Sequence, residues 1–262
     1  MLASMNSVPR DRAGNRFKRS LGKCGQLGLF ATLASAHSAE LLALSGFDWL
    51  LVDTEHSPND LNDVTAQLRS IALHNVSPIV RVAWNDQILV KQLLDTGAQT
   101  LLFPYIETPD QAASAVSFTR YPPAGVRGVA GSSRAAGYGT DDGYLKAADS
   151  EICVIAQIET ALGLENLAAI AGTRGIDAVF IGAADLAASL GHVGDTRHSS
   201  VQRAVDRALD ALRSLGKPRG YLTSDLREAK RRWTEGMDFL ALGTDATLFA
   251  RAARSAIVEV TS

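Results

Sequence analysis

Short apolar segments alternate along this chain with amphipathic ones, and no linker or low-complexity stretch divides them. The apolar segments are 26–32, 47–53, 77–82, 100–104, 151–159, 177–182, 218–223 and 239–243. Their near-continuous hydrophobicity is typical of parallel strands that are covered on both faces. The intervening patterns predict helices at 38–45, 60–74, 86–96, 108–120, 161–171, 199–215, 225–235 and 245–259. Asp60, Thr108 and Asp225 have the residue types and positions of helix N-caps.

Eight such strand–helix units in 262 residues predict an α/β fold, a single (β/α)₈ TIM barrel. An open doubly wound sheet is the alternative, but no glycine-rich fingerprint follows the first strand. We expect a flexible N-terminal extension at 1–15 and the barrel domain at 16–262. The long connection 121–150 contains Tyr121-Pro122-Pro123 and six glycines, which predicts a shaped loop rather than a helix.

Composition excludes several classes of protein. The chain has 26 Lys and Arg against 28 Asp and Glu, so it lacks the basic surface of a nucleic-acid-binding protein or a membrane-surface protein. No apolar run approaches the roughly 18 residues of a spanning helix. Cys24 and Cys153 do not form a disulfide framework. We therefore expect a cytoplasmic protein with neither nucleic-acid nor membrane partners.

In a (β/α)₈ barrel the active site lies at the carboxyl ends of the strands. Ionisable and amide side chains gather where the apolar segments of this chain end. They are Asp53, Glu55, His56, Arg81, Asn85, Asp86, Gln157, Glu159, Asp185 and Asp245. These positions hold the candidate functional residues.

Glu159 and Asp185 follow neighbouring strands, with little positive charge near them in the sequence. Crowded carboxylates repel one another, and their pKa values rise, unless a cation neutralises them. Two protein oxygens, with the other positions open to water and substrate, commonly hold Mg²⁺ or Mn²⁺. Capping of the following helices is an equally ordinary use of these acids. A zinc site is disfavoured because no His pair or Cys cluster has ligand spacing.

His56 has the side chain of a general base near neutral pH, although a partly exposed loop histidine is the simpler interpretation. Either Asp53 or Asp95 could orient its ring, and the residues alone do not choose between them. Arg81 ends a buried strand, where its charge needs a carboxylate or an oxyanion as partner. Such an arginine suits a developing enolate.

The chain has six lysines, and none follows the carboxyl end of a predicted strand. A Schiff-base aldolase mechanism is therefore disfavoured. The ends of the seventh and eighth strands also lack the glycine-rich phosphate site of many barrels, which favours an unphosphorylated substrate.

Long motifs in this chain resemble one known family. They are Phe47-Asp48-Trp49, Asp53-Thr54-Glu55-His56-Ser57-Pro58-Asn59-Asp60, Arg81-Val82-Ala83-Trp84-Asn85-Asp86, Arg120-Tyr121-Pro122-Pro123-Ala124-Gly125-Val126-Arg127-Gly128, Gln157-Ile158-Glu159-Thr160 and Phe180-Ile181-Gly182-Ala183-Ala184-Asp185-Leu186. In this order they resemble the HpcH/HpaI aldolases over residues 16–260. The resemblance implies a divalent-metal-dependent class II pyruvate aldolase on a (β/α)₈ barrel. It also implies a homohexamer in which the last helix is exchanged between paired subunits.

The resemblance assigns roles to five side chains. Glu159 and Asp185 would be the metal ligands, and Arg81 would hold the pyruvate oxygen that becomes the enolate oxygen. His56, paired with Asp95, would serve the acid–base step.

Gln157 and the backbone around Ala184, together with Asp185, would contact the pyruvate moiety under the same resemblance. The chain departs from the family's usual pattern at Thr54, where Gly is general, and at Ala183, where Pro is general. Both departures spare the functional groups.

The implied reaction is the reversible cleavage of a 4-hydroxy-2-oxo acid, such as 4-hydroxy-2-oxoheptanedioate, to pyruvate and an aldehyde. We expect Mg²⁺, Mn²⁺ or Co²⁺ as cofactor and no nucleotide. The alternatives are an oxaloacetate decarboxylase, an acyl-CoA lyase and a barrel that only binds a 2-oxo acid. Arg127 and Arg134 of the long connection would meet either the distal carboxylate of the substrate or another subunit, and we favour the subunit contact.

Overall fold

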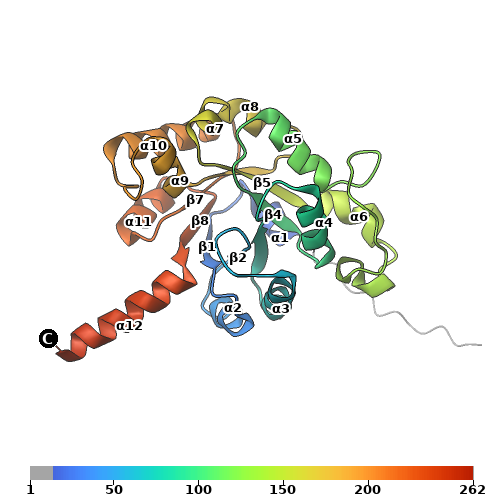
Figure 1. Cartoon of the computed structure of the whole chain (residues 1–262), viewed down its shortest axis with the longest axis horizontal. Coiled ribbons are helices and arrows are strands. Elements are labelled where there is room, and N and C mark those ends of the chain that lie inside the picture. Colours follow the sequence, from blue (N-terminus) through green and yellow to red (C-terminus); the bar gives the residue numbers. More distant parts are fainter. Residues whose placement is uncertain (1–13, 262) are drawn as a thin grey trace, which may run out of the picture.

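The computed structural model describes residues 14–261 and contains a closed barrel of eight parallel strands (Figure 1). The strands are β1 (Gln26–Ala31), β2 (Trp49–Asp53), β3 (Ser77–Arg81), β4 (Thr100–Phe103), β5 (Cys153–Ile158), β6 (Ala178–Ile181), β7 (Arg219–Leu222) and β8 (Phe239–Thr244). Each strand pairs with the next in the chain, and β8 pairs with β1. The predicted TIM-barrel fold and all eight predicted strands are confirmed.

The predicted helices are present around the barrel. They are α2 (Ala36–Ala43), α3 (Leu61–Ile71), α4 (Gln87–Asp95), α5 (Pro109–Phe118), α7 (Ala161–Glu165), α8 (Leu167–Gly172), α10 (Ser199–Ser214), α11 (Leu226–Thr234) and α12 (Asp245–Thr261). Asp60, Thr108 and Asp225 each accept main-chain N–H bonds in the first turn of their helices, as predicted for N-caps.

Four further elements were not predicted: α1 (Arg16–Ser20), the 3₁₀ helix η1 (Arg134–Gly139), α6 (Tyr144–Glu151) and α9 (Ala183–Ser189). The prediction of a loop without helix over 121–150 is wrong in its second half, because η1 and α6 lie there. Only Ala148 of α6 is buried, so this helix lacks the apolar stripe by which a sequence pattern is recognised.

The amino-terminal end of the barrel is closed by α1. Phe17 packs edge-on against Phe239, with ring centroids 5.3 Å apart. Asn15 caps α1 and donates to Thr100 Oγ1 at 2.9 Å. Asn15 belonged to the extension expected at 1–15, and it is in fact buried against the barrel. Residues 1–13 of that extension lie outside the described residues.

Large aromatic side chains fill the barrel interior, and glycines on neighbouring strands make room for them. A Cβ atom at Gly28 would lie 2.1 Å from the ring of Trp49, and one at Gly220 would lie 2.2 Å from the ring of Phe239. Interiors packed at this density tolerate no added methyl group without rearrangement. A second apolar layer lies between the strands and the surrounding helices.

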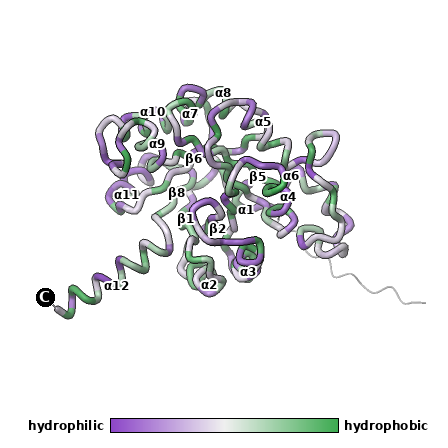
Figure 2. Tube along the Cα trace, viewed as in Figure 1, coloured by the Kyte–Doolittle hydropathy of each residue, from purple (hydrophilic) through white to green (hydrophobic). Residues whose placement is uncertain are grey.

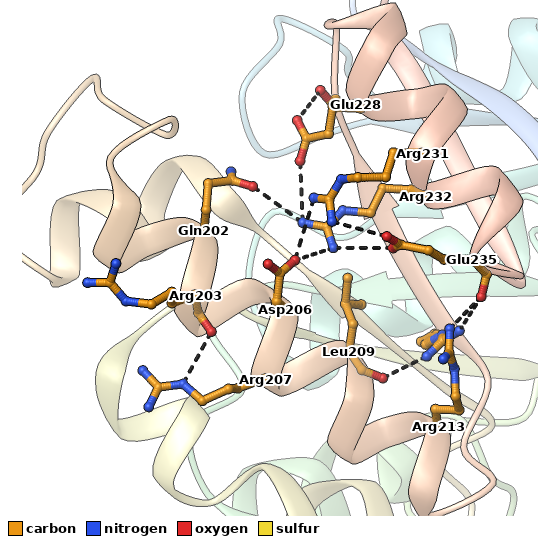
Figure 3. A network of polar contacts seen from close by, with 12 residues as sticks. Gln202, Arg203, Asp206, Arg207, Leu209, Arg213, Glu228, Arg231, Arg232 and Glu235 are labelled. Carbon is orange, nitrogen blue, oxygen red and sulfur yellow. Dashed lines mark hydrogen bonds and ion pairs between the residues drawn. The ribbon is translucent and has the colours of Figure 1, made fainter.

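An arginine network joins α10 to α11 on the outer wall (Figure 3). Arg232 is buried, with Nη1 2.5 Å from Asp206 on α10 and Nη2 3.4 Å from Glu228 on α11. Its guanidinium also lies 5.1 Å from the ring centroid of Tyr221 on β7. Arg219 donates to three main-chain carbonyls, including that of Leu209 on α10 at 2.8 Å. The contacts of Arg219 and Arg232 in this network give both residues a structural role.

The last helix, α12, projects away from the barrel (Figure 1) and carries hydrophobic as well as hydrophilic positions along its length (Figure 2). Phe249 is 71 % exposed and Ile257 64 % exposed. No helix among residues 14–261 is both long and apolar enough to span a membrane.

We expect Gly220→Ala to destabilise the protein by about 1–3 kcal/mol, because the new methyl group overlaps the rings of Phe239 and Phe180. For a domain of this size that corresponds to a loss of roughly 3–10 °C in Tm, measured by circular dichroism. Gly172→Ala is the matched control, since nothing lies within 4 Å of its Cβ position. Equal Tm values for the two variants would contradict this account of the barrel interior.

Candidate active site

Two carboxylates lie at the carboxyl-terminal rim of the barrel. Glu159 directly follows β5 and is 1 % exposed, and Asp185 lies in the first turn of α9, after β6. The Tyr105 main-chain N–H donates to Glu159 Oε1 at 2.7 Å, and the Gln157 side-chain amide donates to Oε2. A Cβ atom at Gly182 would lie 2.6 Å from Glu159 Oε2, so glycine is needed there for this carboxylate to fit.

Helix capping does not account for Glu159. The N-cap of α7 is Thr160, whose side chain accepts from Gly163 N–H. The side chain of Glu159 instead accepts the bonds from Tyr105 and Gln157. The capping alternative is therefore wrong for this residue.

Burial, aided by the nearby charges of Glu55 and Asp185, raises the pKa of Glu159 to about 7, although the hydrogen bonds from Gln157 and Tyr105 lower it. Burial likewise raises the pKa of Glu55 to about 7, although Arg81 opposes the shift. When Glu159 and Glu55 are ionised, the positive charge near them is too small to balance their negative charge. A divalent cation would relieve that imbalance, and oxygen donors are the ligands it prefers.

The donor set of Glu159 and Asp185 therefore fits a divalent cation. Among residues 14–261, no group of three or more His, Cys, Asp or Glu side chains is arranged to enclose a metal. A cation held by these two carboxylates would keep positions open for water and substrate.

Arg81 ends β3 and is 7 % exposed. Its Nε and Nη2 atoms donate to the two oxygens of Asp53 at 2.8 and 2.6 Å, and Nη1 lies 2.9 Å from Glu55 Oε2. Burial opposes its charge, but the bonds and charges of Asp53 and Glu55 raise the pKa of Arg81 overall. A guanidinium has five N–H donors and two of them are bonded to Asp53, so donors on Nη1 and Nη2 remain for a substrate oxygen.

His56 and Asp95 are not brought together within the chain. The His56 side chain is 58 % exposed, and its ring nitrogen lies 3.8 Å from Glu55 Oε2. Asp95 is the last residue of α4, which runs back toward the amino-terminal end of the barrel, and it pairs with Arg127 at 3.7 Å. Asp53 is occupied by Arg81. The described contacts therefore place neither aspartate beside His56 within one chain, and the pairing of His56 with Asp95 stays a prediction.

Comparison with known proteins identifies the family of this chain. Residues 26–252 match the family model described as HpcH/HpaI aldolase/citrate lyase. The chain belongs to the HpcH/HpaI aldolase/citrate lyase family. It is 48 % identical over 239 residues to a pyruvate aldolase of Rhizobium etli, covering 90 % of this chain and 94 % of that protein.

Two further relatives support the assignment to the HpcH/HpaI family. The chain is 47 % identical over 244 residues to the 4-hydroxy-2-oxo-heptane-1,7-dioate aldolase of Shigella sonnei, covering 92 % of this chain and 93 % of that one. The crystal structure of a family protein from Burkholderia cenocepacia J2315 is 44 % identical and superposes with a TM-score of 0.91, over 95 % of this chain and 100 % of that chain. The curated relatives are named aldolases, which are carbon–carbon lyases.

The long loop of this HpcH/HpaI barrel is tied to α4. Arg127 is buried, stacks at 4.5 Å from the Tyr121 ring centroid and donates to Tyr144 at 2.8 Å. Arg134 donates to the Thr96 carbonyl oxygen, just beyond α4, at 2.5 Å. These contacts do not support a role in binding the distal carboxylate of a substrate.

Two residues of the site were assigned no role by the sequence analysis. Glu55 was only one of the candidates at the strand ends, yet it pairs with Arg81. Tyr105 lies two residues beyond β4, a strand end for which the sequence analysis named no candidate. Its hydroxyl donates to Asp185 Oδ1 at 3.0 Å. Burial, and then the bond to Asp185, raise the pKa of Tyr105 to about 12, so the hydroxyl keeps its proton.

We expect Glu159→Gln to stabilise the metal-free protein at pH 8 relative to the parent chain and to have less effect at pH 5. A carboxyl whose folded pKa is raised favours the folded state while it is protonated. That contribution is lost as the pH rises from about 4.5 through 7. Glutamine cannot ionise, so the difference in Tm between the two proteins should grow with pH. The measurement is thermal unfolding in EDTA at both pH values.

The control for this prediction is Glu165→Gln, an exposed glutamate on α7. Its Tm difference from the parent should be the same at both pH values. Added Mn²⁺ at pH 8 should stabilise the parent and not Glu159→Gln. Parallel pH curves for Glu159→Gln and the parent would disprove the assigned repulsion.

Proposed function

We propose that this chain is a divalent-metal-dependent class II pyruvate aldolase. It cleaves a 4-hydroxy-2-oxo acid, such as 4-hydroxy-2-oxoheptanedioate, reversibly into pyruvate and an aldehyde. The observation that carries this proposal is the buried carboxylate of Glu159, with the half-buried Asp185 and with Arg81 at the same rim, in a barrel whose curated relatives are aldolases.

Glu159 and Asp185 hold the metal, which is Mg²⁺, Mn²⁺ or Co²⁺. The bound cation supplies Lewis-acid polarisation of the 2-oxo group. No Schiff-base lysine takes part, since none of the six lysines follows the carboxyl end of a strand. This distinguishes the proposed mechanism from that of an amine-dependent aldolase.

Arg81 binds the 2-oxo oxygen, which becomes the enolate oxygen. Two hydrogen bonds to Asp53 and the ion pair with Glu55 fix the guanidinium on one side, so its remaining N–H donors are already directed before substrate arrives. The fixed guanidinium of Arg81 then stabilises the negative charge that develops on the enolate oxygen.

The carboxylate of pyruvate binds at the start of α9. No side-chain cap is present there among the described residues, so the N–H groups of Ala184 and Asp185 are available to an anion. The side-chain NH₂ of Gln157 lies close to Gly182, at the start of α9, and would donate to the pyruvate moiety. These groups orient the 2-oxo acid.

His56 acts as the general base for the 4-hydroxyl group of the substrate. It accepts the 4-hydroxyl proton as the C3–C4 bond breaks, and the electron pair of that bond stays with the pyruvate fragment as its enolate. The aldehyde leaves, and protonation at C3 gives pyruvate. The exposed position of His56 allows it to exchange that proton with solvent.

The protein assembles as a homo-oligomer, in this proposal a hexamer, with α12 exchanged between subunits. Support comes from the exposed apolar side chains of Phe249 and Ile257 on a helix that projects from its own barrel (Figure 1). Exposed apolar surface of this kind is covered in a stable assembly.

Removal of the metal should abolish cleavage. We expect pyruvate release from 4-hydroxy-2-oxoheptanedioate, followed with lactate dehydrogenase, to stop in EDTA and to return with Mg²⁺, Mn²⁺ or Co²⁺. Borohydride added with pyruvate should leave the mass of the protein unchanged. Full activity in EDTA, or a borohydride-trapped adduct, would contradict the proposed class of aldolase.

We expect Arg81→Lys to lower kcat by about 10²–10³, because lysine cannot keep the bonds to Asp53 and Glu55 and also stabilise the enolate oxygen. The rate is measured in the same coupled assay at saturating metal. Arg174→Lys, an exposed arginine just before β6, is the matched control and should retain the parent rate. Retention of the parent rate in Arg81→Lys would rule out the assigned role.

A further inference from the structure

Tyr105 contacts both proposed metal ligands, and we infer that it is a positioning residue for the cation site. Its main-chain N–H donates to Glu159 Oε1 at 2.7 Å and its hydroxyl donates to Asp185 Oδ1 at 3.0 Å. This inference rests on the proposed function, because it concerns the same pair of carboxylates.

The two carboxylates come from different elements of the barrel. Glu159 follows β5 and Asp185 lies on α9, while Tyr105 comes from the segment after β4. Two ligands on separate elements need a third group to fix their relative geometry, and Tyr105 supplies bonds to both. Partners of this kind orient the ligands of metal sites.

The backbone at Tyr105 is held in an unfavourable conformation. Its φ angle is +51°, in the left-handed region that costs a tyrosine about 1 kcal/mol. Two bonds to β5 and its end stabilise this turn: Tyr105 N–H to Glu159, and Ile106 N–H to the Gln157 carbonyl at 3.2 Å. A strained backbone conformation persists where surrounding contacts hold it in place. At Tyr105 those contacts are the hydrogen bonds to Glu159 and Gln157, which are residues of the site.

The ring of Tyr105 packs against the ring of Trp84, which fixes its orientation. The two ring centroids lie 5.6 Å apart with the planes tilted by 36°. This packing depends on the ring and not on the hydroxyl. Phenylalanine at 105 would therefore keep the ring contact and the main-chain bond, and would remove only the donor to Asp185.

The hydroxyl bond occupies Oδ1 of Asp185 and leaves Oδ2 for a cation. Without that bond the Asp185 carboxylate is free to rotate, and this freedom must be lost again when a metal binds. Loss of such a partner weakens metal affinity by about 10–100-fold. We therefore expect Tyr105→Phe to bind a divalent cation about 10-fold more weakly than the parent chain.

The test is direct titration of the EDTA-stripped full-length protein with Mn²⁺, followed by the electron paramagnetic resonance signal of free Mn²⁺. The expected result is an increase of about 10-fold in Kd for Tyr105→Phe. The Mn²⁺ concentration that gives half-maximal pyruvate release should rise by the same factor. Unchanged circular dichroism and Tm in EDTA show that the variant is folded.

Tyr138→Phe is the matched control. Tyr138 also has a positive φ angle, +58°, and its hydroxyl accepts a bond from Arg69 at 3.2 Å, on the long loop away from the rim. The same chemical change at the same backbone conformation should leave the Kd for Mn²⁺ unchanged.

Parent-like or tighter Mn²⁺ binding by Tyr105→Phe would overturn the positioning role and leave the proposed aldolase intact. An equal loss of affinity in Tyr138→Phe would also overturn it. Absence of Mn²⁺ binding in the parent chain would overturn both this inference and the metal dependence in the proposed function. The titration therefore separates the two failures.

Discussion

Burial of Glu159 near Glu55 and Asp185 raises the free energy of the ionised folded protein, because like charges face one another with little solvent between them. The surrounding groups at this rim reduce that cost without removing it. Tyr105 and Gln157 donate hydrogen bonds to Glu159, while Arg81 neutralises Glu55. The remaining negative charge is of the kind that a divalent cation would neutralise.

Stability is supplied at the other end of the barrel and on its outer wall. Phe17, Trp49 and Phe239 pack edge-on beneath the site, and Arg232 joins α10 to α11 outside it (Figure 3). Neither set contacts the carboxylates at the rim. Because the two regions are separate, the packed interior can offset the electrostatic cost of the site. In (β/α)₈ barrels generally, the carboxyl-terminal face carries the active site and the amino-terminal face contributes stability.

The strands could be predicted because apolar runs covered on both faces have a strong local pattern. The position of Glu159 and Asp185 at one rim followed from the fold, since parallel strands bring their carboxyl ends together. The partner of Arg81 could not be chosen, because Asp53 and Glu55 are its neighbours only through the β2–β3 register. The partner of His56 could not be chosen from the sequence, because a motif carries no information about which end of the barrel a helix ends at; within one chain Asp53 is bonded to Arg81 and Asp95 ends α4.

The departures from the family pattern, Thr54 and Ala183, lie beside the functional groups of the site and do not replace them. The Thr54 hydroxyl donates to the Arg81 carbonyl at 2.6 Å and so ties the His56 loop to β3. Ala183 is the first residue of α9, the helix position where proline would fix φ in advance. With alanine there, the turn before Asp185 is less restrained by its own backbone. The Tyr105 hydroxyl then supplies a restraint on Asp185 that proline would otherwise contribute through the main chain.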